Sequence, residues 1–274
     1  MRHATLPCLA VFVSLLSTVR AQGEDPVTRL ENSPRHHEWV NIKTDAGRTV
    51  RTFVAFPEAP GPTAALVVIH ENRGLNVWAR SFADQMAEAG YLAIAPDLLS
   101  GTGPDGGGTE AFGSADAARN GIYKLPDEQV GADLDAVIAF AQKHPAGTGV
   151  VAAAGFCWGG GKSFAHAATN SGVSAACVFY GTAPQDDATY QAISAPVYGF
   201  YGGNDHRITG AVPEVKKKME TLGKKYDPVA YEGAGHAYMR AGESASEGDP
   251  NYEARAKSLV RLKGILSELT KEKQ

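Results

Sequence analysis

Cys157 stands in a short motif whose residue types and spacing suit a nucleophile. The motif Gly155-Phe156-Cys157-Trp158-Gly159 follows an apolar stretch and precedes a stretch of small residues. Glycines on both sides of the cysteine permit a turn from strand to helix that is too tight for side chains at those places. We expect this turn to strain the backbone of the cysteine and to project its sulfur from a helix N-terminus, where thiolate is favoured. A buried structural cysteine between packing glycines is the alternative interpretation.

His236 and Asp205 are the residues best placed to activate that sulfur. A sulfur nucleophile that must also protonate a leaving group needs an imidazole beside it. His236 lies in a glycine loop after the last predicted strand, and Asp205 follows an earlier strand. The chain order nucleophile, acid, histidine matches proteins built around such a turn, and the carboxylate would fix the tautomer of the ring. Alternatively, Asp205 caps a helix and His236 is a surface loop residue, while His206 is a rival base.

Alternating strand and helix patterns bring these residues to one edge of a predicted sheet. Strands are expected at 37–44, 49–56, 64–70, 91–96, 149–154, 173–180, 195–201 and 227–231, and helices at 77–89, 127–143, 159–169, 211–222 and 252–269. Several strands are apolar throughout, which is typical of strands buried on both faces. The pattern predicts an α/β fold with a mostly parallel central sheet and helices on both faces, and in such sheets sites lie at the carboxyl ends of strands.

The glycine-rich segment 100–125 is predicted to be a flexible loop near the mouth of the site. A phosphate cradle is the alternative, but the segment contains neither of the glycine patterns that bind nucleotide phosphates.

The length, composition and charge of the chain limit the classes of protein to which it can belong. The 274 residues, 43% of them hydrophobic, suit one large globular domain. The formal net charge is −4 and no basic stretch stands out, which argues against nucleic acid as a partner. We expect a small-molecule substrate and a monomer.

The first residues resemble a secretory signal rather than part of a fold. Arg2 precedes the apolar run 9–16, and the small residues Val19 and Ala21 fit a cleavage site before Gln22. We therefore predict a signal peptide at 1–21, a domain at 22–274, a periplasmic or secreted location and no membrane association after cleavage. A retained N-terminal anchor is the alternative, although the apolar run is short for a membrane span.

Cys177 and the remaining histidines give little sign of metal or redox chemistry. Cys177 lies in the middle of an apolar strand, so a packed core thiol is expected there. A disulfide between Cys157 and Cys177 would remove the nucleophile, and no resolving partner for thiol redox chemistry accompanies Cys157. A zinc site on His36 and His37 has little support because adjacent side chains point apart on a strand. We expect no metal and no organic cofactor.

The chain resembles the dienelactone hydrolase family of α/β-hydrolases from about Val40 to the final helix. The segments that carry the resemblance are 70–75 (HENRGL), 155–160 (GFCWGG), the loop around Asp205, and 233–236 (GAGH). The resemblance implies the α/β-hydrolase fold and a catalytic triad of Cys157, Asp205 and His236.

The resemblance also implies roles for residues outside the triad. Glu71 would contact the thiol and help to form thiolate when substrate arrives, whereas a solvated charge or a partner for Arg73 is the alternative. The backbone N–H groups of Trp158 and Asn72 would form the oxyanion hole. Arg240, four residues after His236, would bind a substrate carboxylate, unless it is a surface charge.

One departure from the family pattern leaves the identity of the substrate undetermined. A second family arginine is expected just after Pro96-Asp97-Leu98, but this chain continues with Leu99-Ser100-Gly101. We therefore expect a hydrolase that cleaves a different ester or lactone through a thioester acyl-enzyme. A non-catalytic ligand-binding protein on the same fold is the alternative.

Overall fold

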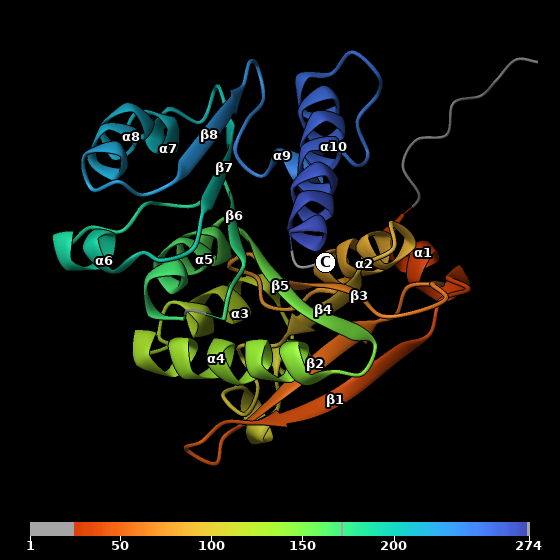
Figure 1. Ribbon diagram of the computed structural model, residues 1–274. Coiled ribbons are helices and arrows are strands. Elements are labelled where there is room, and N and C mark those ends of the chain that lie inside the picture. The colour runs from red at the N-terminus through yellow and green to blue at the C-terminus, as the bar shows by residue number, and fades with distance from the viewer. Residues whose placement is uncertain (1–24, 171, 273–274) are drawn as a thin grey trace, which may run out of the picture.

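The computed structural model describes residues 25–272 apart from residue 171, and it is drawn in Figure 1. The predicted signal peptide lies outside these residues. Within them, one eight-stranded sheet has the order β1-β2-β4-β3-β5-β6-β7-β8. The strands are β1 (His37–Lys43), β2 (Thr49–Ala55), β3 (Thr63–Ile69), β4 (Leu92–Pro96), β5 (Gly147–Phe156), β6 (Ala175–Phe179), β7 (Val197–Gly202) and β8 (Tyr226–Tyr231).

The sheet is parallel from β4 onward, and β2 pairs antiparallel with both β1 and β4. Its central strands are apolar throughout because helices cover both faces. In β3, for example, Leu66 and Val68 enter one hydrophobic core while Val67 and Ile69 enter the other. The predicted α/β-hydrolase architecture is therefore confirmed.

The helices form two layers, as Figure 1 shows. Their bounds are α1 (Pro26–Asn32), α2 (Val77–Glu88), α3 (Ala115–Ile122), α4 (Asp127–Lys143), α5 (Trp158–Thr169), α6 (Asp187–Ala192), α7 (His206–Thr209), α8 (Val212–Thr221), α9 (Tyr238–Ala241) and α10 (Pro250–Lys271). Side chains of α1, α2, α9 and α10 contribute to one core, and those of α4, α5, α6 and α8 to the other.

The prediction of a loop at 100–125 was wrong for its second half. Two short 3₁₀ turns, η1 (Pro104–Gly106) and η2 (Thr109–Phe112), lead into α3. Ser114 caps α3 by accepting a hydrogen bond from the N–H of Ala117. Ala118 and Ile122, one helical turn apart, bury against Leu99 in a small third core. The neighbouring glycines obscured this short amphipathic pattern.

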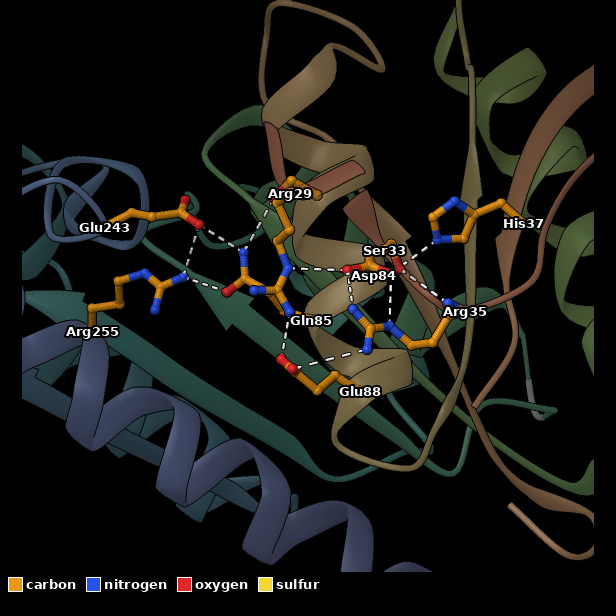
Figure 2. Close-up of polar contacts among 10 residues, drawn as sticks. Arg29, Ser33, Arg35, His37, Asp84, Gln85, Glu88, Glu243 and Arg255 are labelled. Carbon is orange, nitrogen blue, oxygen red and sulfur yellow. Dashed lines mark hydrogen bonds and ion pairs between the residues drawn. The ribbon is translucent and has the colours of Figure 1, made fainter. Parts of the chain in front are cut away.

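The N-terminal segment is fastened to α2 through Asp84, as Figure 2 shows. The fully buried carboxylate of Asp84 accepts hydrogen bonds from Ser33 (2.6 Å) and from Arg35 (2.7 and 2.8 Å). Arg29 and His37 contact the same carboxylate at 3.0 and 2.9 Å. Burial alone would raise the pKa of Asp84, but the hydrogen bonds from His37, Arg35 and Ser33 hold it well below its usual range. Asp84 is therefore ionised and joins α1 and β1 to the body of the domain.

Cys177 is fully buried in β6 and, like Cys157, forms no disulfide. Burial raises the pKa of the Cys177 thiol to about 12, so it is an inert core residue, as predicted. None of the helices between residues 25 and 272 is long and apolar enough to cross a membrane.

Candidate active site

Cys157 occupies the turn between β5 and α5 in a strained backbone conformation. Its φ of 53° and ψ of −113° lie outside the regions that non-glycine residues normally adopt. The N–H of Cys157 donates to the carbonyl of Phe179 at 3.0 Å, which fixes the turn to the neighbouring strand β6. The sulfur is partly exposed at the carboxyl edge of the sheet.

The glycines of the motif are required by close backbone approach. A Cβ at Gly155 would overlap the carbonyl of Gly159, and a Cβ at Gly159 would overlap the carbonyl oxygens of Ile69 and His70. The start of α5 therefore lies directly against the end of β3. This approach brings the segment after β3, including Glu71, next to the cysteine.

His236 links the sulfur to a buried carboxylate. Its Nε2 lies 3.1 Å from the Sγ of Cys157, and its Nδ1 lies 2.6 Å from the Oδ2 of Asp205. The hydrogen bond with Cys157 raises the pKa of His236, burial lowers it, and the hydrogen bond with Asp205 raises it again, so that the net shift is upward. The Asp205 side chain is only 6% exposed, which keeps it aimed at the ring.

Glu71 is buried and is held from two sides. The hydroxyl of Tyr180 donates to its Oε1 at 3.3 Å, and Nε of Arg240 donates to its Oε2 at 3.1 Å. Among the described residues, no hydrogen bond joins Glu71 to Cys157. Arg240 therefore forms an ion pair with Glu71 while 37% of its side chain stays exposed. It is not a fully solvated surface charge, and its contact with Glu71 does not bury it.

Tyr180 is a site residue that the sequence reasoning missed. It is fully buried, adopts a φ of 41°, and packs its ring against His236 with the centroids 5.1 Å apart. Burial, followed by the charge of Glu71, raises its pKa well above the usual value, so the hydroxyl keeps its proton. A hydroxyl at the end of an otherwise apolar strand was the signal that could have identified it.

The two amides predicted to form an oxyanion hole are available. The N–H groups of Trp158 and Asn72 donate to no acceptor within the described part of the chain. The ring of Trp158 stacks on His70, with 5.7 Å between centroids. Burial lowers the pKa of His70, which is therefore neutral. Because its Nε2 accepts from the N–H of Leu98, its Nδ1 donates to the carbonyl of Glu71 at 2.8 Å.

These side chains surround a cavity of about 730 Å³. Of the predicted site residues, Glu71, Asn72, Cys157, Trp158, His236 and Arg240 line it. Asp205 stands behind His236. The lining also includes Arg73, Arg119, Tyr123, Lys162 and Arg207, none of which was predicted as a site residue from sequence. Between residues 25 and 272, no three His, Cys, Asp or Glu side chains gather as metal ligands.

Arg255 of α10 holds the turn that carries Arg240 in place. Nε of Arg255 donates to the carbonyl of Met239 at 3.0 Å, and its Nη2 contacts Glu243 at 3.3 Å. Glu243 also accepts 2.7 Å hydrogen bonds from Trp78 and Gln85 of α2. Figure 2 shows the Gln85–Glu243–Arg255 part of this network beside the Asp84 contacts, so one helix supports both the N-terminal segment and the α9 turn.

Comparison with known proteins identifies the family. The profile described as "Dienelactone hydrolase family" matches residues 50–268, which is most of the chain. The chain belongs to the dienelactone hydrolase family. It is 32% identical over 200 residues to a Methylorubrum extorquens protein assigned as a carboxymethylenebutenolidase, covering 69% of this chain and 68% of the relative. It is also 30% identical over 216 residues to the carboxymethylenebutenolidase of Pseudomonas putida, covering 76% of this chain and 88% of the relative.

The solved structures agree with this membership. A Klebsiella pneumoniae protein assigned as a dienelactone hydrolase superimposes with a TM-score of 0.73 at 27% identity, over 85% of this chain and 98% of the other. The predicted family and the predicted class, a hydrolase of esters or lactones, are thereby confirmed. The roles of the individual site residues stay predictions.

Proposed function

We propose that the protein hydrolyses a small-molecule ester or lactone through a thioester formed on Cys157. The observation that carries this proposal is the continuous chain of contacts from the Cys157 sulfur through His236 to Asp205, at the wall of an open cavity. In a family of hydrolases, such a chain suits nucleophilic catalysis with an imidazole as general acid and base.

In the acylation step, the Cys157 sulfur attacks the ester carbonyl carbon and the thiol proton passes to His236. The carbonyl oxygen becomes negatively charged, and the N–H groups of Trp158 and Asn72 stabilise it. When the tetrahedral intermediate collapses, the bond to the alcohol oxygen breaks, and His236 gives its proton to the leaving alkoxide. The raised pKa of His236 favours the protonated ring that this step needs.

In the deacylation step, water attacks the thioester carbonyl while His236 accepts a proton from it. The carbon–sulfur bond then breaks, the acid product leaves, and the proton returns to sulfur. Asp205 keeps the ring oriented through both steps and stabilises its protonated form.

Glu71 and Arg240 would connect substrate binding to the nucleophile. Arg240 contacts Glu71 only through Nε, which leaves the outer nitrogens of its guanidinium group for an acidic group of the substrate. A substrate carboxylate at Arg240 competes with Glu71 for the same cation. A Glu71 side chain weakened in that contact can turn toward the Cys157 thiol and accept a hydrogen bond from it, while the proton itself passes to His236.

The test is hydrolysis of p-nitrophenyl esters by variants of the two described cysteines. Cys157→Ala should lower the turnover number by at least about 10³-fold, because it removes the atom that forms the acyl-enzyme. Cys177→Ala, the matched control, changes a cysteine buried in the core and should retain hydrolysis. Turnover that persists in Cys157→Ala, or a wild type that binds esters without releasing product, would refute the proposal; the second result would indicate a ligand-binding protein.

A further inference from the structure

The cavity around Cys157 is cationic although the whole chain is acidic. Its lining contains five cationic side chains and two carboxylates, and the chain as a whole carries a formal charge of −4. The cationic residues are Arg73, Arg119, Lys162, Arg207 and Arg240. Lys162 pairs with Asp127 and Arg240 pairs with Glu71, whereas the other three form no ion pair with any described residue. Unpaired arginines in a concave wall attract anions.

A second cavity continues the first one on the side of α8. It has a volume of about 260 Å³ and shares Thr182, Ala183, Pro184, Arg207 and Ile208 with the cavity around Cys157. Because the same side chains line both cavities, the two adjoin. Together they are larger than a small lactone requires.

The second cavity is lined by both apolar and charged side chains, and Glu214 is the carboxylate among them. Ile208, Tyr190 and Val215 in its lining are 6%, 3% and 7% exposed. Its other cation, Lys218, pairs with Asp187 and lies over the ring of Tyr190. Arg207 is thus the cation in this lining that has no ion-pair partner among the described residues.

Arg207 is held at the junction by the element that follows the triad acid. It lies on α7, and the carbonyl of Asp205 accepts hydrogen bonds from the N–H groups of Ile208 and Thr209, each at 2.9 Å. The hydroxyl of Thr209 donates to the same carbonyl at 2.9 Å. The short helix therefore presents the exposed Arg207 at a fixed place between the two cavities.

We propose that the two cavities form an extended substrate groove in which Arg207 binds a carboxylate on the far arm of an ester. The substrate class is an ester whose reacting carbonyl is separated by an apolar spacer from that carboxylate. The spacer would lie along Ala165, Ala183 and Pro184, which line the same cavity as Cys157 and Arg207. This inference rests on the proposed function, and it concerns a different place from Arg240, which lies beside Glu71.

The experiment compares paired p-nitrophenyl esters of short and long acyl chains, each ending either in a carboxylate or in a methyl group. For the long chains, the wild type should show a kcat/KM about tenfold higher for the carboxylate-ended member, as expected for one charge-assisted contact. Arg207→Gln should reduce this ratio to about one, and Arg207→Lys should keep part of it because the charge is retained. Acetate esters of phenols that carry an acidic side arm test whether the carboxylate belongs to the alcohol part instead.

Arg73→Gln is the matched control, because it removes another unpaired arginine from the same cavity. It should keep the long-chain ratio within about twofold, as expected when a local contact rather than the general field sets the preference. An equal loss in Arg73→Gln, or no carboxylate preference with either arm, overturns the inference. If the wild type hydrolyses the methyl-ended esters through Cys157 without such a preference, only the extended groove is refuted; if no ester is hydrolysed, the proposed function fails first.

Discussion

At the scale of single residues, the site depends on the different partners that the two ring nitrogens of His236 contact. Nε2 faces the sulfur and Nδ1 faces Asp205, so the ring can gain or lose a proton only on the side of the reaction. Contacts with both neighbours raise the pKa of the ring. A raised pKa keeps a larger fraction of the ring protonated for acylation, but the ring must be neutral to activate water during deacylation.

Asp205→Asn should therefore change both the rate and its pH dependence. Loss of the carboxylate lowers the pKa of His236, so the acid limb of the deacylation rate should move to lower pH. The rate itself should fall by about 10²- to 10⁴-fold, because the amide no longer fixes the tautomer or stabilises the protonated ring. Single-turnover measurements of thioester hydrolysis between pH 5 and 9 give both quantities. An acid limb that stays in place would contradict the assignment of His236 as the base.

The three residues of the proposed triad could be located from sequence because each carries a local signal. Glycines flank Cys157, and glycines precede both Asp205 and His236. Tyr180 and Arg207 carry no such signal. Tyr180 ends an apolar strand and Arg207 lies on a four-residue helix, so only the folded chain shows that both reach the cavity.

At the scale of elements, the approach of α5 to β3 is the feature that builds the site. The predicted strands and the predicted helices after position 77 lie close to the observed ones because apolar periodicity marks long buried elements well. The helices that the sequence did not predict, α1, α3, α6, α7 and α9, have between four and eight residues. Such short elements bury too few residues to show a period, and capping and tertiary contact stabilise them.

Gly159→Ala tests the requirement for this approach. The added methyl group would overlap backbone carbonyls at the end of β3, which cannot move like a side chain. We expect the free energy of unfolding to fall by about 2 kcal/mol or more, together with a loss of esterase activity. Gly264→Ala is the control, since a Cβ at Gly264 in α10 meets nothing within 4 Å and alanine favours helix. Denaturant unfolding compares the two variants, and equal stabilities would refute the packing argument.

At the scale of the whole molecule, Asp84 ties the N-terminal segment to the rest of the fold. Its folded-state pKa is lowered, so the stability it contributes is present above the ordinary aspartate pKa and is lost as the pH falls through the folded value. This tie could not be predicted from sequence, because the partners of Asp84 lie about 50 positions away from it.

Asp84→Asn should lower the free energy of unfolding at pH 7 by about 3 kcal/mol, because buried cationic partners lose their countercharge. The difference from wild type should shrink below about pH 4, because Asp84 of the unfolded wild-type chain begins to gain a proton there while the folded protein still binds none. Glu88→Gln is the control: Glu88 contacts the same two arginines but is 57% exposed, so its loss should cost less than about 1 kcal/mol. Thermal and urea unfolding between pH 3 and 7 measure the difference in the free energy of unfolding between wild type and Asp84→Asn. A difference that stays constant over this range would contradict the prediction.

The residues around the sulfur come from segments that emerge at very different times during synthesis. Cys157 is made 48 positions before Asp205 and 79 before His236, and β8 must join the sheet before the imidazole can reach the sulfur. A nascent chain that ends before β8 therefore holds a cysteine with no base beside it. The proposed reactive centre comes into being only after β8 and His236 have been made, which spares the unfinished protein from side reactions of an activated thiol.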